Sequence, residues 1–165
     1  MYGRPVSLLA AAMLLAGCSE PTGPAAGTFE ARLSGALAAA LSGPSNGDLV
    51  YSEALPEGRY TISMVAAQGD SVRLISIQFA GQVLPAPGTY AVSALDADSQ
   101  GRYSLLASGL EVVQRASASS GSVTISEVSQ GQAVGTFSFS GTLVTGPDTT
   151  GTVTVAGAFS ATLRS

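Results

Sequence analysis

The chain has 165 residues and a formal net charge of −4, from seven basic and eleven acidic side chains. All the basic residues are Arg, and the sequence contains no Lys, no His, no Trp and a single Cys, Cys18. These absences exclude Ser-His-Asp and Cys-His nucleophile systems, lysine Schiff-base chemistry and nearly all zinc sites. Because the chain has so few basic residues, it lacks the positively charged surface that binds nucleic acid, and we expect no nucleic-acid partner.

Residues 1–17 have the pattern of a secretory signal peptide. Arg4 is their one charge, and an apolar run of eleven residues extends from Val6 to Ala16. A membrane-spanning helix needs about 20 apolar residues, so this run is too short to cross a bilayer. The alternative is a short buried helix at the start of a cytosolic protein. We predict a signal peptide that is removed after export.

The motif Leu15-Ala16-Gly17-Cys18 follows the apolar run directly. It resembles the lipobox of bacterial lipoproteins. The resemblance implies cleavage between Gly17 and Cys18, diacylglycerol on the Cys18 thiol and an acyl chain such as palmitate on its amino group. Stable anchoring takes at least two acyl chains, which this modification supplies. By analogy with enterobacterial sorting, Ser19 in place of Asp favours the outer membrane. The alternative is a free, buried cysteine.

Two segments follow the cleavage site. Residues 18–27 are rich in Pro, Gly and small side chains and are typical of a flexible tether. From Thr28 onward apolar and polar residues alternate with a period of two, which predicts one all-β domain over residues 28–165. The clearest strands are Thr28–Gly35, 135–144 and 151–163. Weaker ones are 48–52, 59–67, 71–79, 88–93, 101–107, 110–115 and 121–128.

About ten short strands separated by turn residues indicate an antiparallel β-sandwich or β-barrel of 8–10 strands. Tight hairpin turns are predicted at Gly69-Asp70 and Gly131-Gln132. Residues 36–41 (ALAAAL) have high helix propensity but are too few for a stable helix, so we expect a continued strand or a single turn. The frame F-x-A-x-L begins at both Phe29 and Phe159. We predict that the first and last strands lie in one sheet and pair, closing the structure.

The C-terminal half resembles a family of lipobox-bearing bacterial lipoproteins with a β-rich domain of unknown function. The family pattern appears as Pro87-Gly88-Thr89-Tyr90, Ser120-Gly121-Ser122-Val123-Thr124-Ile125, Gly135-Thr136-Phe137-Ser138-Phe139, and Gly151-Thr152-Val153-Thr154-Val155 ending at Phe159. The segment 156–158 departs slightly from the family's usual Asn-Gly spacing. The resemblance implies the fold and the anchor, and it implies no activity and no catalytic residues.

Two carboxylate pairs are candidate sites. Asp96 and Asp98, followed by Gly101, resemble the start of a calcium-binding loop. Gln100 and Ala107 do not match that loop, so we favour a solvated turn and expect no metal and no cofactor. Glu53 and Glu57 are the other pair, which could act as a general acid and a general base. Nothing in the sequence orients them, so we interpret them as loop charges.

The tyrosines that follow the predicted cleavage site suit either a binding surface or cross-strand packing, and we favour packing. They are Tyr51, Tyr60, Tyr90 and Tyr103.

Hydroxyl side chains cluster around one predicted strand. Flat faces of this kind bind ice or glycans, but solvation of a Lys-free sheet is the simpler interpretation. The hydroxyl residues are Ser117, Ser119, Ser120, Ser122, Thr124 and Ser126.

Three functions remain open. The favoured one is a non-catalytic module, held on a membrane through Cys18, that binds an envelope protein, a glycan or a small ligand. The others are a purely structural surface lipoprotein and, least favoured, a carboxylate-based hydrolase. A concave pocket with converging Tyr, Arg and Asp side chains would favour binding, whereas a filled and featureless core would favour the structural role.

Overall fold

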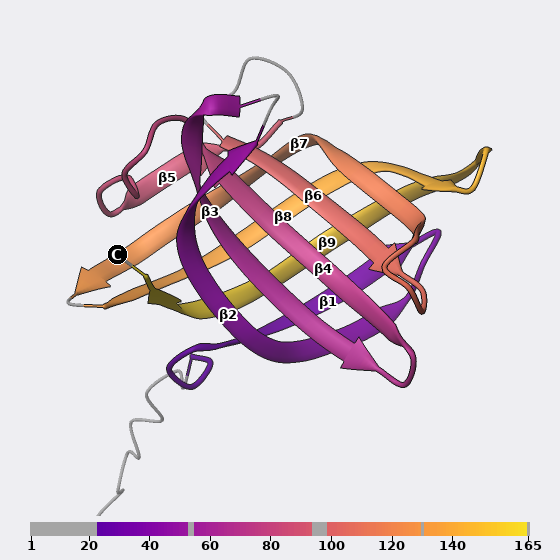
Figure 1. Cartoon of the computed structure of the whole chain (residues 1–165), viewed down its shortest axis with the longest axis horizontal. Coiled ribbons are helices and arrows are strands. Elements are labelled where there is room, and N and C mark those ends of the chain that lie inside the picture. Colours follow the sequence, from indigo (N-terminus) through magenta and orange to yellow (C-terminus); the bar gives the residue numbers. More distant parts are fainter. Residues whose placement is uncertain (1–22, 53–54, 94–98, 130, 165) are drawn as a thin grey trace, which may run out of the picture.

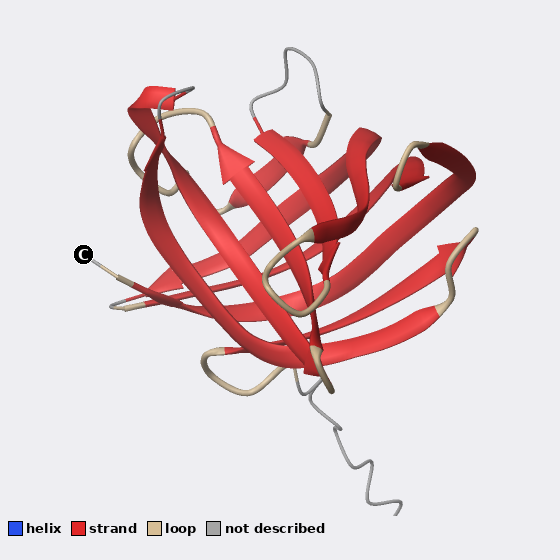
Figure 2. Cartoon of the chain, turned by 45° about the vertical axis from the view of Figure 1, so that its right-hand side comes forward, coloured by secondary structure: helices blue, strands red, loops and turns tan. Residues whose placement is uncertain are grey.

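The computed structural model describes residues 23–52, 55–93, 99–129 and 131–164, with only the backbone given at 51, 52 and 55–57. The described residues form strands and no helix, as the absence of blue segments in Figure 2 shows. Within this part of the chain there is accordingly no helix long and apolar enough to cross a membrane. The strands are β1 (Thr28–Gly35), β2 (Ala39–Ser52), β3 (Leu55–Gln68), β4 (Ser71–Phe79), β5 (Gly88–Ala91), β6 (Ser99–Leu106), β7 (Val112–Ser129), β8 (Gln132–Thr145) and β9 (Asp148–Leu163).

Eight of these strands close into an antiparallel barrel in the order β1-β2-β3-β4-β6-β7-β8-β9, with β9 returning to β1 (Figure 1). The short β5 pairs with residues 122–125 of β7, beyond the part of β7 that β6 reaches. The prediction of an all-β fold is therefore confirmed, and of the two predicted architectures the barrel is the one observed. Closure leaves the eight barrel strands without a free edge, which protects the sheet from pairing with other chains.

The pairing of β1 with β9 closes the barrel as the shared F-x-A-x-L frame predicts. Phe29 lies opposite Phe159, and Leu33 lies opposite Val155. Residues opposite each other across two strands share a face of the sheet, so both pairs point into the barrel. The F-x-A-x-L frame shared by the two ends of the chain thus belongs to two strands that pair with each other.

Several predicted boundaries were wrong. The segments 110–115 and 121–128 belong to one strand, β7, which continues past Gly121 through two irregularities of register, between Ala118 and Ser120 and between Ile125 and Glu127. A Cβ atom at Gly121 would lie 2.3 Å from the carbonyl oxygen of Ser138, so the glycine permits close approach of β8 instead of ending the strand. Residues 36–38 form the connection before β2, and the Gly69-Asp70 turn is confirmed.

The barrel interior is filled by apolar side chains that alternate with outward polar ones. Large, fully buried members come from every part of the barrel, which makes the core a single continuous cluster. The largest are Tyr103, Phe29, Phe79, Phe139 and Phe159.

The two ends of the barrel differ in their connections. The distal end, on the right of Figure 1, carries the turns at 36–38, 69–70, 107–111 and 146–147. The other end, on the left, where the chain enters the barrel at Gly27, carries the turn at Gly131 and the C-terminal end of β9. It is called the tether end after the tether predicted for residues 18–27. Backbone hydrogen bonds tie this end together: Ser45 N donates to Gly27 O at 2.7 Å, and Arg164 N donates to Gly47 O at 2.8 Å.

Candidate functional site

Aromatic side chains pack tightly against two glycines in the middle of the barrel. A Cβ atom placed at Gly135 would lie 2.7 Å from Cζ of Phe159, and one at Gly101 would lie 3.0 Å from Cδ1 of Phe139. Aromatic rings therefore occupy even the space above the glycines. This packing favours a site at a mouth or on the outer face of the barrel.

The mouth at the distal end contains a polar layer. Arg73, Leu105, Gln114 and Thr145 are register partners across β4, β6, β7 and β8. Their side chains all point into the barrel, because residues two apart in a strand lie on the same face of the sheet. Gln114 Nε2 donates to Thr145 Oγ1 at 3.3 Å, and that hydroxyl lies 3.1 Å from Thr150 Oγ1. The apolar core thus ends in hydrogen-bonding groups on this side.

Tyr103 lies one layer below Arg73, since its register partner is Ile75. The Tyr103 side chain is fully buried, and this burial raises the pKa of its phenol, while the Arg73 guanidinium nearby acts in the opposite direction. A side-chain hydrogen bond with Arg73 contributes to that opposing effect, yet among the described residues no hydrogen bond of regular geometry reaches Tyr103 Oη, Arg73 Nε or Arg73 Nη1. A buried donor without an acceptor costs about 1–3 kcal/mol, so these three atoms require an explanation.

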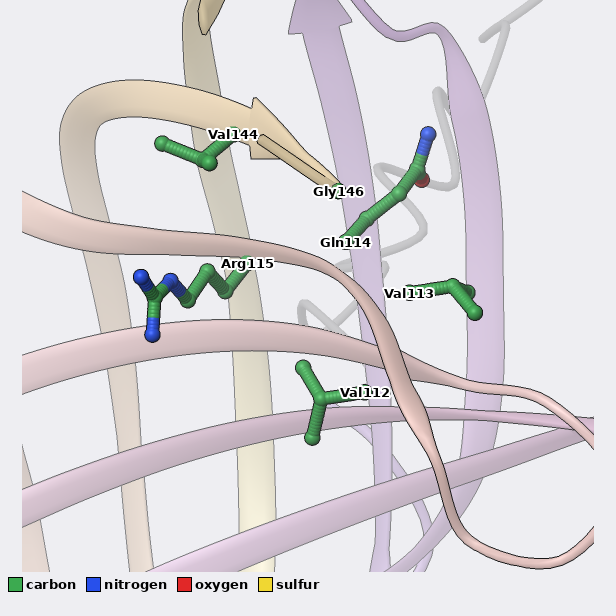
Figure 3. A pocket seen from close by; sticks show the side chains of 6 residues that line it. All are labelled: Val112, Val113, Gln114, Arg115, Val144 and Gly146. Carbon is green, nitrogen blue, oxygen red and sulfur yellow. The ribbon is translucent and has the colours of Figure 1, made fainter. Parts of the chain in front are cut away.

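Next to this layer lies a depression of about 230 Å³. Figure 3 shows Gln114 and Val113 pointing to one side of it, and Arg115 and Val144 pointing to the other. Gln114 belongs both to this depression and to the polar layer, so the two adjoin. The remaining lining residues are Val112 and Gly146.

The mouth at the tether end is apolar and larger, about 640 Å³. Val83 at its rim is 77% exposed and Val128 is 40% exposed. Tyr60 forms part of the floor, and the pKa of its phenol is raised by burial and further by the Asp48 carboxylate. The lining residues are Leu49, Tyr60, Gln82, Val83, Leu84, Val128, Gly131, Leu163 and Arg164.

The hydroxyl cluster predicted from the sequence lies on the outer face of β7. Several members bond to neighbouring strands: Ser119 Oγ donates to Ser140 O at 3.0 Å, and Ser126 Oγ donates to Val134 O at 3.0 Å. Both lie beside the irregularities of β7, where backbone carbonyls lose their regular partners. These hydroxyls therefore serve the sheet itself, in agreement with the solvation interpretation.

Apart from three of the tyrosines, the structure does not describe the side chains of the other site residues predicted from the sequence. Gly17, Cys18, Glu53, Asp96 and Asp98 lie outside the described residues. Tyr51 and Glu57 lie in strands whose side chains are not described there. Among described residues no group of three or more His, Cys, Asp or Glu side chains is placed to hold a metal.

The described tyrosines pack as predicted. Tyr60 and Tyr103 are buried, whereas Tyr90 contacts Phe79 edge-on with ring centroids 6.0 Å apart. The Tyr90 hydroxyl donates to Ala86 O at 2.6 Å.

Arg73 is not among the site residues predicted from the sequence, although the sequence contains a signal for it. It occupies the same phase of β4 as Ile75, Ile77 and Phe79, all of which are buried. A charged residue on the buried phase of a strand is unusual and marks a position to inspect.

No protein-family model, no curated protein and no solved structure matches this chain. Its function is therefore inferred from the sequence motifs and from the structure of the barrel.

Proposed function

We propose that this chain is an exported bacterial lipoprotein of the outer membrane, anchored through lipid on Cys18, whose barrel is a non-catalytic module that binds an anionic group at its distal mouth. The observation that supports the binding role is the Arg73 guanidinium on the inward face of the distal mouth, whose Nε and Nη1 make no hydrogen bond of regular geometry within the described part of the chain. The anchor is supported by the motif Leu15-Ala16-Gly17-Cys18. The likeness of the C-terminal half to lipobox-bearing lipoproteins adds support to the same assignment.

The chemistry of the distal mouth favours an anion. A guanidinium has only donors, and a phenol hydroxyl beside it donates when the acceptor is an oxyanion. Hydrogen bonds from Arg to carboxylate or phosphate are about twice as strong as neutral ones. An anionic group beside the Arg73 guanidinium would compensate a partly buried charge.

The position of this mouth suits an anchored protein. The chain enters the barrel at Gly27, and the turn at 69–70 next to Arg73 lies at the opposite end. The distal mouth would therefore face away from the membrane, toward solution or a neighbouring envelope protein, while the lipid stays in the membrane. Binding in this way needs no chemistry from His, Lys or Cys, none of which the barrel contains.

The binding role is tested by titrating inorganic phosphate and acetate into the protein and following the Arg Nε–Hε signals by NMR. We expect one signal, lost in Arg73→Gln, to shift saturably. Arg102→Gln is the matched control, because Arg102 is exposed on the outer face of adjacent β6. Shifts that persist unchanged in Arg73→Gln, or no saturable shift, would leave the structural role of the alternative hypothesis as the better account.

The anchoring role has a separate test. Cells expressing the full chain are labelled with a fatty-acid probe and fractionated, next to cells expressing Cys18→Ala. We expect the label and the membrane association to disappear together in the variant. Continued membrane association of Cys18→Ala would overturn the anchor and leave the binding proposal intact.

A further inference from the structure

The tether-end mouth is the most exposed apolar feature at the end where the chain enters the barrel. Leu49, Leu163 and Val128 face inward at the ends of their strands, and no side chain described there covers them fully. Val83 extends from the connection after β4 and is 77% exposed. Large apolar side chains gathered at one end of a soluble domain indicate a contact surface.

The route of the chain indicates what that contact is. Gly27 is hydrogen-bonded to Ser45, and a Cβ atom on Gly27 would lie 2.9 Å from Oγ1 of Thr162. Thr162 precedes Leu163, which lines the mouth. From Cys18 to Gly27 the chain advances nine residues, so even a fully extended tether reaches at most about 30 Å. The lipid proposed on Cys18 therefore keeps Gly27 within about 30 Å of the bilayer.

We propose that the tether-end mouth docks on the surface of the bilayer in which the protein is anchored, with Val83, Leu84 and Val128 entering the interface. This docking rests on the proposed anchoring and adds an orientation to it: the tether end faces the lipid and the distal mouth faces away. Tethering raises the local concentration of the surface, so an apolar contact too weak to recruit a free protein suffices for an anchored one.

The charges near this mouth show that the contact is apolar. Asp48 and Glu127 adjoin the lining residues Leu49 and Val128 in the chain, and Arg164 lies in the lining itself. Charges of both signs give no net attraction to anionic lipid, unlike a polybasic surface. Neutral phosphatidylcholine is therefore an adequate probe, and docking on it is expected to be insensitive to salt.

The test uses the absence of Trp from the chain. The barrel strands lie within 28–163, so residues 18–165 contain the complete barrel. The Cys18 thiol, the one thiol present, is coupled to a maleimide phospholipid in phosphatidylcholine vesicles, which enforces anchoring chemically. Val83→Trp and Leu110→Trp are compared, because Leu110 is similarly exposed, at 73%, but lies at the distal end. Emission wavelength and quenching by brominated phosphatidylcholine are measured for both.

We expect Trp emission at position 83 to shift to shorter wavelength and to be quenched by shallow bromines at least twofold more than emission at position 110. Equal quenching at both positions, or none at either, would overturn the docking and leave the lipidation of Cys18 untouched. A shift at position 83 without quenching would also overturn it, since the indole would then be shielded from water without contact with the bilayer. A shift that grows with protein concentration without vesicles would indicate a second copy as the occupant.

Discussion

Phe29 and Phe159 are direct register partners across the seam between β1 and β9, and both are fully buried. Phe159 also stacks on Phe137 with ring centroids 6.4 Å apart, and Phe137 lies 6.3 Å from Phe139. The aromatic residues of three neighbouring strands thus meet where the two ends of the chain close the barrel.

Replacing Phe159 with Ala is expected to destabilise the barrel by about 3–5 kcal/mol, because the truncation leaves a cavity at the closing seam. Urea unfolding followed by circular dichroism measures the change. Thr162→Ala on the same strand is the control, since Thr162 is exposed, and we expect its effect to stay within about 0.5 kcal/mol. Similar losses in the two variants would contradict the role of Phe159 in closure.

Gly135→Ala should destabilise the barrel through overpacking. The added Cβ would lie 2.3 Å from the Thr124 carbonyl oxygen and 2.7 Å from Cζ of Phe159. Forcing atoms into a packed core costs about 1–3 kcal/mol. Gly23→Ala is the matched control, because nothing lies within 4 Å of the Cβ position there. A Gly135→Ala variant as stable as Gly23→Ala in thermal denaturation would show that the strands separate freely at this point.

Replacement of two buried serines by Ala is expected to have different effects on the stability of the barrel. Ser45 Oγ is buried beside Met64 and has no hydrogen-bond partner among the described residues, so Ser45→Ala is expected to leave stability unchanged or raise it. Ser160 Oγ accepts a hydrogen bond from Gln132 Nε2, so Ser160→Ala is expected to cost about 1 kcal/mol. Guanidinium unfolding of both variants compares them, and the reverse order would contradict the assignment of partners.

The barrel is expected to lose stability in alkali. Burial raises the pKa of Tyr60 and Tyr103 above the ordinary value of 10.0, so the unfolded chain gives up these protons first. Stability from this source is full below pH 10.0 and falls as the pH rises through the folded pKa. Urea midpoints between about pH 8 and about pH 11 measure the loss, and Tyr60→Phe should reduce it. A loss of the same size in Tyr60→Phe would assign the effect to other groups.

Much of the fold could be predicted from the sequence because half-buried strands carry their burial as a period of two. The alternation in Thr28–Gly35 predicted β1 to the residue, and the repeated F-x-A-x-L frame predicted its partner. The barrel itself could not be separated from a sandwich, since both present the same alternation. The full length of β7 could not be predicted either, because the sequence does not distinguish Gly121 within a strand from a glycine in a turn.

The mouths of the barrel were harder to predict than its strands. Arg73, Tyr103 and Gln114 lie on three different strands, and only the register of the closed sheet brings them to one end. The apolar mouth at the tether end likewise joins Leu49, Val83 and Leu163 from distant parts of the chain. No local motif links such residues, whereas the motif at Cys18 is local and is visible in the sequence alone.

The anchor is the central claim, and mass spectrometry of the N-terminal peptide from membrane-extracted protein tests it most directly. We predict that the peptide begins at Cys18 and carries the mass of a diacylglyceryl thioether, with a further acyl chain on the amino group in hosts that add one. A peptide that begins at Met1, or an unmodified Cys18 thiol in the membrane-bound protein, would contradict it.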